Sequence, residues 1–213
     1  MSERASGART WEQIARRVRV PLGFLMAVVY LVEAARRPPH PVAIAWSLAL
    51  VLPGLALRAA ASGTVKKNRE LTITGPYAYT RNPLYVGSAL IAAGFAVGLE
   101  SWWVALLIAF GFTAIYAAVI ASEERFLRGR FSEFDSYCRI VPRFFPRLTP
   151  GKAAPGHDAN PVSQPVTQVT GGGFSLQLYM KHREYNAALG AALLYLSLLY
   201  LQPVLERIFY HAG

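Results

Sequence analysis

Five blocks of apolar residues constrain this chain more than any other feature. The blocks cover approximately residues 20–35, 42–61, 84–99, 102–121 and 187–205. Hydrophobic residues make up 54% of the chain and charged residues only 16%, so the clustered pattern favours a bilayer over a soluble core. The first block is short for a membrane span, but basic residues at both of its ends can reach the headgroups. The sequence therefore predicts an all-α, polytopic helical membrane protein with about five transmembrane helices.

The basic residues gather on alternate sides of these blocks, which indicates how the chain crosses the membrane. Five arginines precede the first block, four Lys or Arg separate the second and third, and nine separate the fourth and fifth. The opposite side carries three: Arg36, Arg37 and Arg207. Arg58 lies near the inner end of the second block. Because positive loops stay cytoplasmic, we expect an inner or plasma membrane protein with a cytoplasmic N-terminus and with residues 62–83 and 122–186 on that face.

The net charge and the metal-binding residue types narrow the range of partners. A formal charge of +10 would suggest nucleic acid in a soluble protein, but here the positive residues flank apolar blocks and suit a lipid bilayer. We therefore predict the bilayer as a partner and no nucleic acid. Cys138 is the only cysteine and the four histidines are scattered, so no metal site is predicted. Nothing in the sequence specifies an oligomeric state.

Composition also divides the chain into three parts. Residues 1–150 are predicted to form a membrane domain with four transmembrane helices and cytoplasmic segments. Residues 151–186 begin with a stretch rich in Gly, Pro and Ala and are predicted to form a linker. Residues 187–213 are expected to add one further C-terminal transmembrane helix.

Two cytoplasmic segments are richer in functional side chains than connecting loops need to be. We call residues 69–85, which contain three tyrosines, the first strip, and residues 123–146, which begin with two glutamates, the second strip. Only Glu100 and Ser101 separate the third and fourth apolar blocks, so these blocks should form one helical hairpin. The two strips then lie at the same end of that hairpin and should be neighbours in space.

Glu123 and Glu124 directly follow the fourth apolar block, where a helix is expected to end. A carboxylate at the membrane boundary is costly when it dips inward and is often functional. The ordinary alternative is a solvated helix end whose carboxylates pair with Arg125 or Arg128. In the same way, the tyrosines of the first strip have an alternative role as interface aromatics.

The order and spacing of both strips resemble a known family. The pattern is GPYxYxRNPxY, then a hydrophobic hairpin, then EExxL, and finally FxxFxxYxxxVPRFxP. It is similar to the isoprenylcysteine carboxyl methyltransferases, which are related to the phospholipid N-methyltransferases, and it covers about residues 62–147. The resemblance implies S-adenosylmethionine (SAM) as a methyl donor bound at the cytoplasmic face.

The resemblance also implies roles for individual residues. Its cofactor contacts fall on the following residues: Arg69, Glu70, Leu71, Thr72, Tyr77, Asn82, Pro83, Leu84, Tyr85 and Glu123. Arg143 is a further candidate, because its guanidinium could bind the cofactor carboxylate. We assign catalytic roles to Arg81, Asn82, Tyr85 and Glu124. The prenylcysteine enzymes have His at the position of Asn82, and an Arg where this chain has Val119 and Ile120. An asparagine retains hydrogen bonding but does not titrate.

The chemistry of SAM is compatible with these side chains. Glu123 or Glu124 could hold a cationic or hydroxyl group, and Arg81 or Arg143 could hold the cofactor carboxylate. Tyrosine faces could stabilise the sulfonium through cation–π contacts worth roughly 0.5–2 kcal/mol. The chain lacks a G-x-G-x-x-G motif after a strand, which excludes the soluble doubly wound methyltransferase layout.

The predicted function is methyl transfer from SAM to a lipophilic acceptor that enters from the bilayer. The acceptor nucleophile is left open among a carboxylate, an amine and a thiol. One alternative is a phospholipid or small-amine N-methyltransferase. Others are an NADPH-dependent membrane reductase of the sterol type and a non-enzymatic membrane assembly protein.

Overall fold

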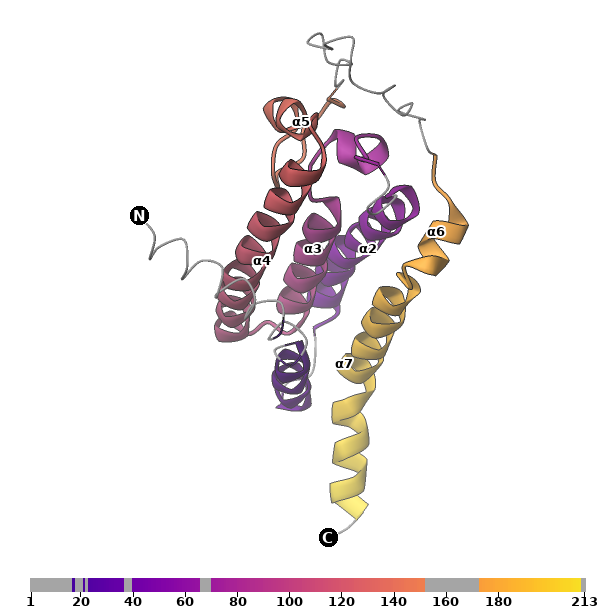
Figure 1. Cartoon of the computed structure of the whole chain (residues 1–213). Coiled ribbons are helices and arrows are strands. Elements are labelled where there is room, and N and C mark those ends of the chain that lie inside the picture. Colours follow the sequence, from indigo (N-terminus) through magenta and orange to yellow (C-terminus); the bar gives the residue numbers. More distant parts are fainter. Residues whose placement is uncertain are drawn as a thin grey trace, which may run out of the picture. The chain divides into compact units, whose positions relative to one another are not determined.

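The computed structural model describes Arg17, Pro21 and residues 23–36, 40–65, 70–151 and 173–211. Within these ranges the regular secondary structure is entirely helical, and no strand is present. A first helix covers residues 23–36. The helices labelled in Figure 1 follow: α2 (Pro41–Thr64), α3 (Pro83–Gly98), α4 (Trp102–Arg130), α5 (Phe134–Ile140), α6 (Leu176–Lys181) and α7 (Tyr185–His211). The 3₁₀ helix η1 (Gly75–Ala78) lies between α2 and α3 in the chain. The all-helical prediction is confirmed.

Two of the described helices, α2 and α4, are long and apolar enough to cross a membrane. Helix α3 is also apolar, but its 16 residues extend only about 24 Å, less than the bilayer's hydrocarbon core of about 30 Å. The apolar part of α7, Tyr185–Leu201, is likewise shorter. Among the described helices, length and composition therefore support two of the five predicted transmembrane spans.

The end of α4 differs from the expectation. The prediction that Glu123 and Glu124 follow the helix is wrong, because α4 continues to Arg130. The residues beyond the apolar block include Glu, Arg and Leu, which are good helix formers. Arg128 and Arg130 in the last turn also interact favourably with the negative end of the helix dipole. Both glutamates are therefore held on a helix rather than on a loop.

Packing divides the chain into two compact units. Unit 1 comprises the described residues within 1–55, 89–122 and 186–213, and unit 2 comprises those within 56–88 and 123–185. Helices α2, α3 and α4 each contribute residues to both units. The polar strips belong to unit 2.

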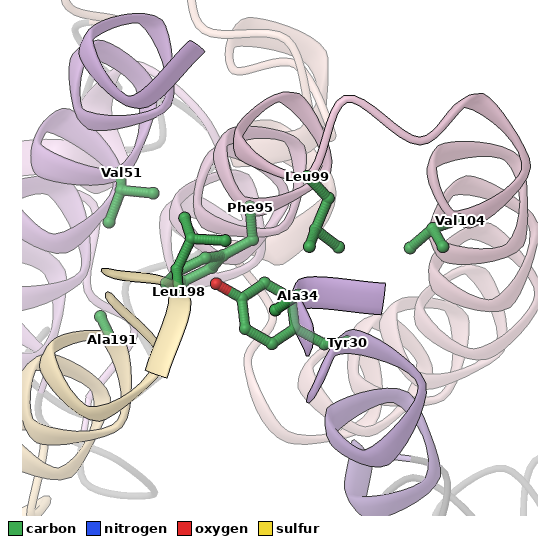
Figure 2. Close-up of a cluster of buried hydrophobic side chains, with 8 residues drawn as sticks. All are labelled: Tyr30, Ala34, Val51, Phe95, Leu99, Val104, Ala191 and Leu198. Atoms are coloured by element: carbon green, nitrogen blue, oxygen red, sulfur yellow. The ribbon is translucent and has the colours of Figure 1, made fainter. Parts of the chain in front are cut away.

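Apolar side chains form the core of unit 1, and Figure 2 shows eight of them: Tyr30, Ala34, Val51, Phe95, Leu99, Val104, Ala191 and Leu198. The rings of Tyr30 and Phe95 meet edge to face with centroids 5.5 Å apart. The Tyr30 hydroxyl donates to the Leu194 carbonyl at 3.1 Å, so this buried polar atom is satisfied.

Close approach of α2 and α3 in unit 1 depends on glycine. A Cβ atom added at Gly94 would lie 2.5 Å from Val51 Cγ2 and 2.8 Å from the Ser47 carbonyl oxygen. One added at Gly98 would lie 3.0 Å from Ser47 Oγ. The GxxxG step formed by these two glycines therefore allows the backbone of α3 to approach α2 more closely than any larger residue would permit.

Unit 1 also exposes many large apolar side chains. Those of Phe24, Trp46, Trp102 and Phe110 are between 66% and 77% accessible. So much exposed apolar area is unusual for a soluble monomer and suits contact with lipid tails and the aromatic interface region. Together with the apolar lengths of α2 and α4, it indicates membrane association.

Candidate active site

Backbone hydrogen bonds join the two strips within unit 2. The amide of Arg81 donates to the Pro142 carbonyl at 2.9 Å, and just after the second strip the amide of Arg147 donates to the Tyr79 carbonyl at 3.0 Å. The amide of Gly151 donates to the Ala78 carbonyl at 2.7 Å. The prediction that the strips are neighbours is therefore confirmed.

Local sequence explains the shape of the first strip. Gly75 has a φ of +59°, a left-handed conformation that glycine adopts without steric cost. Pro76 then lies in the first turn of η1, where a missing amide hydrogen costs nothing. The Tyr137 hydroxyl from α5 donates to the Tyr77 carbonyl at 2.7 Å, and this bond fastens η1 to the second strip.

Asn82 and Thr80 connect the first strip to the Pro-rich end of the second. The Asn82 side-chain amide donates to the Arg143 carbonyl at 2.8 Å, and the Thr80 hydroxyl donates to the Phe144 carbonyl at 2.9 Å. The Asn82 carbonyl also accepts from the amides of Tyr85 and Val86, which starts α3. Asn82 is buried, and its amide hydrogens are used to hold the two strips together.

Glu124 is the buried centre of an ionic network. Its carboxylate is 2.9 Å from Arg81 Nη1, and it accepts from Arg143 Nε at 3.1 Å and from Arg143 Nη2 at 2.5 Å. The Glu124 side chain is only 7% exposed, whereas that of Arg143 is 57% exposed. Hydrogen bonding to Glu124 raises the pKa of Arg143, which stays charged. Both arginines that were candidates for a cofactor carboxylate therefore bind Glu124.

The sequence left open the alternative that Glu123 or Glu124 pairs with Arg128. Arg128 Nε donates instead to Asp135 Oδ1 at 2.8 Å, in an exposed pair. Arg81 also contacts Cys138 Sγ through Nη1, while its Nε atom is buried and has no hydrogen-bond partner among the described residues.

Glu123 faces solvent on the same turn of α4 and joins the two strips directly. The Tyr85 hydroxyl, from the first turn of α3, donates to Glu123 Oε1 at 2.7 Å. Burial raises the pKa of the Tyr77 hydroxyl, and the nearby charges of Glu123 and Glu184 raise it further. Tyr77 is therefore neutral at physiological pH, and Glu123 supplies an accessible negative charge close to it.

The remaining predicted cofactor contacts are distributed unevenly. Arg69 lies outside the described residues. Glu70, Leu71 and Thr72 are half-buried, and Leu71 packs against the apolar cluster formed by Phe134, Tyr137 and Val141. Pro83 is fully buried, and the Leu84 carbonyl accepts from Arg58 Nη1 at 3.3 Å.

Sequence reasoning missed Arg58 and Glu184 as members of this region. It treated Arg58 as one more charge at a block end and Glu184 as part of a linker. In unit 2 the two form an ion pair of 2.5 Å. A usable signal was present, because an arginine within an apolar block needs a partner or a route to water.

The geometry suits recognition of a cation next to a hydrogen-bonding site. Glu123 offers an exposed carboxylate, Tyr77 and Tyr85 offer aromatic rings and hydroxyls, and Glu124 fixes two guanidinium groups beside them. Across the described residues there is no group of three or more His, Cys, Asp or Glu that could hold a metal ion.

Comparison with known proteins supports methyl-transfer chemistry. Residues 46–133 match a family described as phospholipid methyltransferase, and that range includes the whole first strip together with Glu123 and Glu124. No solved structure matches the chain significantly.

Two curated relatives are each 44% identical to this chain over 84 residues. They are the nickel-cobalt-cadmium resistance protein NccN of Alcaligenes xylosoxydans xylosoxydans and the cobalt-zinc-cadmium resistance protein CzcN of Cupriavidus metallidurans. The aligned segment covers 39% of this chain and 39% of each relative, so the likeness spans well under half of their length. The family match and the joined strips point the same way: residues 46–133 are similar to the phospholipid methyltransferase family.

Proposed function

We propose that this protein is an integral membrane methyltransferase that uses SAM to methylate a lipophilic acceptor. The observation that carries the proposal is the hydrogen bond between Tyr85 and Glu123, because it joins two motifs 38 residues apart into one polar surface. The family match over residues 46–133 supports the same chemistry.

The side chains of unit 2 fit the charges of SAM. Glu123 is an exposed carboxylate that suits an ammonium or a ribose hydroxyl, and the rings of Tyr77 and Tyr85 suit a cationic sulfonium. The buried Nε atom of Arg81 has no protein partner in the described chain and suits an anionic group. Bound SAM would supply an electrophilic methyl group.

The protein's own contribution is positioning rather than covalent catalysis. Glu124 holds Arg81 and Arg143, while Asn82 and Thr80 fasten the backbone that carries them. A site preorganised in this way can lower a bimolecular barrier by about 7–11 kcal/mol through orientation alone. We assign Glu123 and Tyr85 to cofactor contact, and Glu124 and Asn82 to holding the site in shape.

A phospholipid or small-amine acceptor is the second candidate. The description of the matching family favours it, as does the presence of Val119 and Ile120 where the prenylcysteine enzymes carry a substrate-binding Arg. An amine acceptor must be neutral to attack, and water could take up its proton. A prenylcysteine carboxylate would need a cation that these positions do not supply.

The proposal includes a topology. The charge distribution of the sequence supports a cytoplasmic N-terminus, about five spans and a cofactor site on the cytoplasmic side. Cysteine-accessibility labelling from each side of the membrane tests it. Labelling of unit 2 from outside the cell would overturn the proposed orientation.

The direct test of function uses the purified protein in lipid nanodiscs. Labelled SAM is incubated with a membrane lipid extract, and labelled products are identified by mass spectrometry. We expect a methylated lipid and thermal stabilisation by SAM. Stabilisation by NADPH instead of SAM would favour the reductase, and stabilisation by neither would favour a non-enzymatic membrane protein.

The names of the two relatives suggest a physiological test. Deleting the gene for this protein and measuring growth on nickel, cobalt, zinc and cadmium salts would test a role in metal resistance. We expect increased sensitivity that a Glu123→Ala variant fails to rescue if methylation underlies the role. Rescue by that variant would separate resistance from methyl transfer.

A further inference from the structure

An arginine within the apolar helix α2 makes three contacts in unit 2. Arg58 Nε donates to Glu184 Oε1 at 2.5 Å, and Arg58 Nη1 donates to the Leu84 carbonyl at 3.3 Å and to Ser88 Oγ. The side chains of Arg58 and Glu184 are only 23% and 11% exposed. Burying an arginine in an apolar helix costs folding free energy unless its guanidinium is paired, so these contacts stabilise the packing around Arg58.

Glu184 belongs to a segment, residues 173–184, that contacts the end of α2 at several points. The amide of Ser175 donates to the Gly63 carbonyl at 2.9 Å, and the His182 ring contacts the Ser62 carbonyl at 2.9 Å through Nδ1. The Phe174 ring occupies the space where any side chain at position 63 would lie. The segment is therefore a packed part of unit 2.

The same arginine connects this segment to the first two turns of α3. Leu84 and Ser88, which receive the two Nη1 contacts of Arg58, flank Tyr85. Tyr85 in turn donates to Glu123. A continuous chain of contacts thus runs from Glu184 through Arg58 and the first turn of α3 to Glu123. Glu184 also lies close enough to Tyr77 to raise the pKa of its hydroxyl.

We propose that Arg58 and Glu184 are positioning residues of the methyl-donor site. Glu184 orients the guanidinium of Arg58, and Arg58 fixes the first turn of α3 so that Tyr85 holds Glu123 in its binding position. The segment before α7 thereby acquires a role in cofactor binding. This inference rests on the proposed function.

Four variants of the full-length protein test this chain of contacts: Arg58→Met, Glu184→Gln, Arg58→Lys and the reversal Arg58→Glu with Glu184→Arg. Two quantities are measured for each. One is the SAM dissociation constant, and the other is amide hydrogen exchange over residues 173–184. Asp135→Asn serves as the matched control, because it breaks an exposed Arg–carboxylate pair in the same unit.

We expect Arg58→Met and Glu184→Gln to weaken SAM binding by at least about tenfold and to speed exchange in the segment. Arg58→Lys should retain most of the affinity, since a lysine can still donate to the Leu84 carbonyl. The reversal should restore slow exchange but not SAM affinity, because a glutamate at position 58 cannot donate to that carbonyl.

The outcomes separate this inference from the proposed function. Wild-type SAM affinity in Arg58→Met and Glu184→Gln, despite fast exchange, would overturn the positioning role and leave the function intact. Recovery of SAM affinity in the reversal would overturn it too, because docking of the segment alone would then suffice. Absence of SAM binding in the wild-type protein would instead refute the proposed function.

Discussion

The two units use different interactions to hold helices together. In unit 1, apolar side chains such as Phe95 and Leu198 fill the core, and glycines let α3 approach α2 closely. In unit 2, polar side chains bridge segments: Glu124 binds two arginines, and Asn82 and Thr80 bind backbone carbonyls. The core of unit 1 is therefore mainly apolar, whereas directional and charged contacts join the two strips of unit 2.

The two kinds of interaction differ in how well they tolerate substitution. Apolar packing tolerates substitutions that conserve volume, because dispersion and burial are not directional. A buried ionic network tolerates little, because removing one partner leaves the others unpaired. Substitutions in unit 1 should therefore change stability, and substitutions in unit 2 should change ligand binding as well.

The largest effect is expected at Glu124. Glu124→Gln removes the charge that neutralises Arg81 and Arg143, and should cost about 3 kcal/mol of folding stability. SAM binding should be lost together with stability. Denaturant unfolding in detergent and SAM titration measure the two effects.

The control for this experiment is Asp135→Asn, which breaks an exposed arginine pair. It should leave both quantities nearly unchanged, because exposed pairs contribute little. Equal effects of the two substitutions would mean that burial of the Glu124 network does not matter.

Glu123→Ala should have the next largest effect, and on binding alone. The side chain is exposed, so its loss leaves no buried charge and the helices should stay intact. SAM affinity should fall by roughly 100-fold, as expected for loss of a charged hydrogen-bond partner. Isothermal titration calorimetry measures the SAM affinity, and circular dichroism measures the helix content. Unchanged affinity would refute the assignment of Glu123.

A substitution in unit 1 should have the opposite signature. Gly94→Ala places a methyl group against Val51 and the Ser47 carbonyl, and should cost about 1–3 kcal/mol through overpacking. Gly129→Ala is the matched control, since nothing lies within 4 Å of its added Cβ and alanine favours the helix. The SAM affinity of folded Gly94→Ala should match wild type. A changed affinity would show that the contrast between the units fails.

Tyr85→Phe should have a smaller effect than loss of Glu123. It removes one hydrogen bond to the Glu123 carboxylate but keeps the ring and the charge. SAM affinity should fall by about three- to tenfold, in line with the net value of a single hydrogen bond. An effect as large as that of Glu123→Ala would instead assign the Tyr85 hydroxyl a direct role.

The smallest effect concerns alkaline pH. Burial raises the pKa of Tyr77 and Tyr137 above the ordinary value of 10.0. The folded state therefore keeps these protons longer than the unfolded state, and their contribution is full below pH 10 and lost above it. Stability should stay flat between about pH 7 and 9, and the decline above pH 10 should be shallower in Tyr137→Phe. An identical decline in that variant would exclude Tyr137 as a source of the stability loss at alkaline pH.

Much of the helical layout and the meeting of the two strips could be predicted from sequence. Apolar blocks predicted the positions of α2, α3 and α4. The short connection at Glu100 and Ser101 predicted that α3 and α4 form a hairpin. The partners of Glu124 could not be predicted. Several arginines follow Glu124 closely, yet its partners are Arg81 and Arg143, 43 and 19 residues away.

The extension of α4 was missed for a related reason. Hydropathy falls at Ser122, but a helix ends where backbone hydrogen bonding ends, and the charged residues after it are good helix formers. The Arg58–Glu184 pair was missed because its members are 126 residues apart and no periodic pattern connects them.

The helical class, the positions of the apolar helices and the motifs that resemble a methyltransferase can all be read from the sequence, since they depend on local periodicity and spacing. Which polar side chains meet depends on the folded arrangement: Glu124 with two arginines, Glu123 with Tyr85, and Glu184 with Arg58. Such pairings depend on how distant segments fold against one another. Coulomb and hydrogen-bond energies act over a few ångströms of space, whatever the separation along the chain.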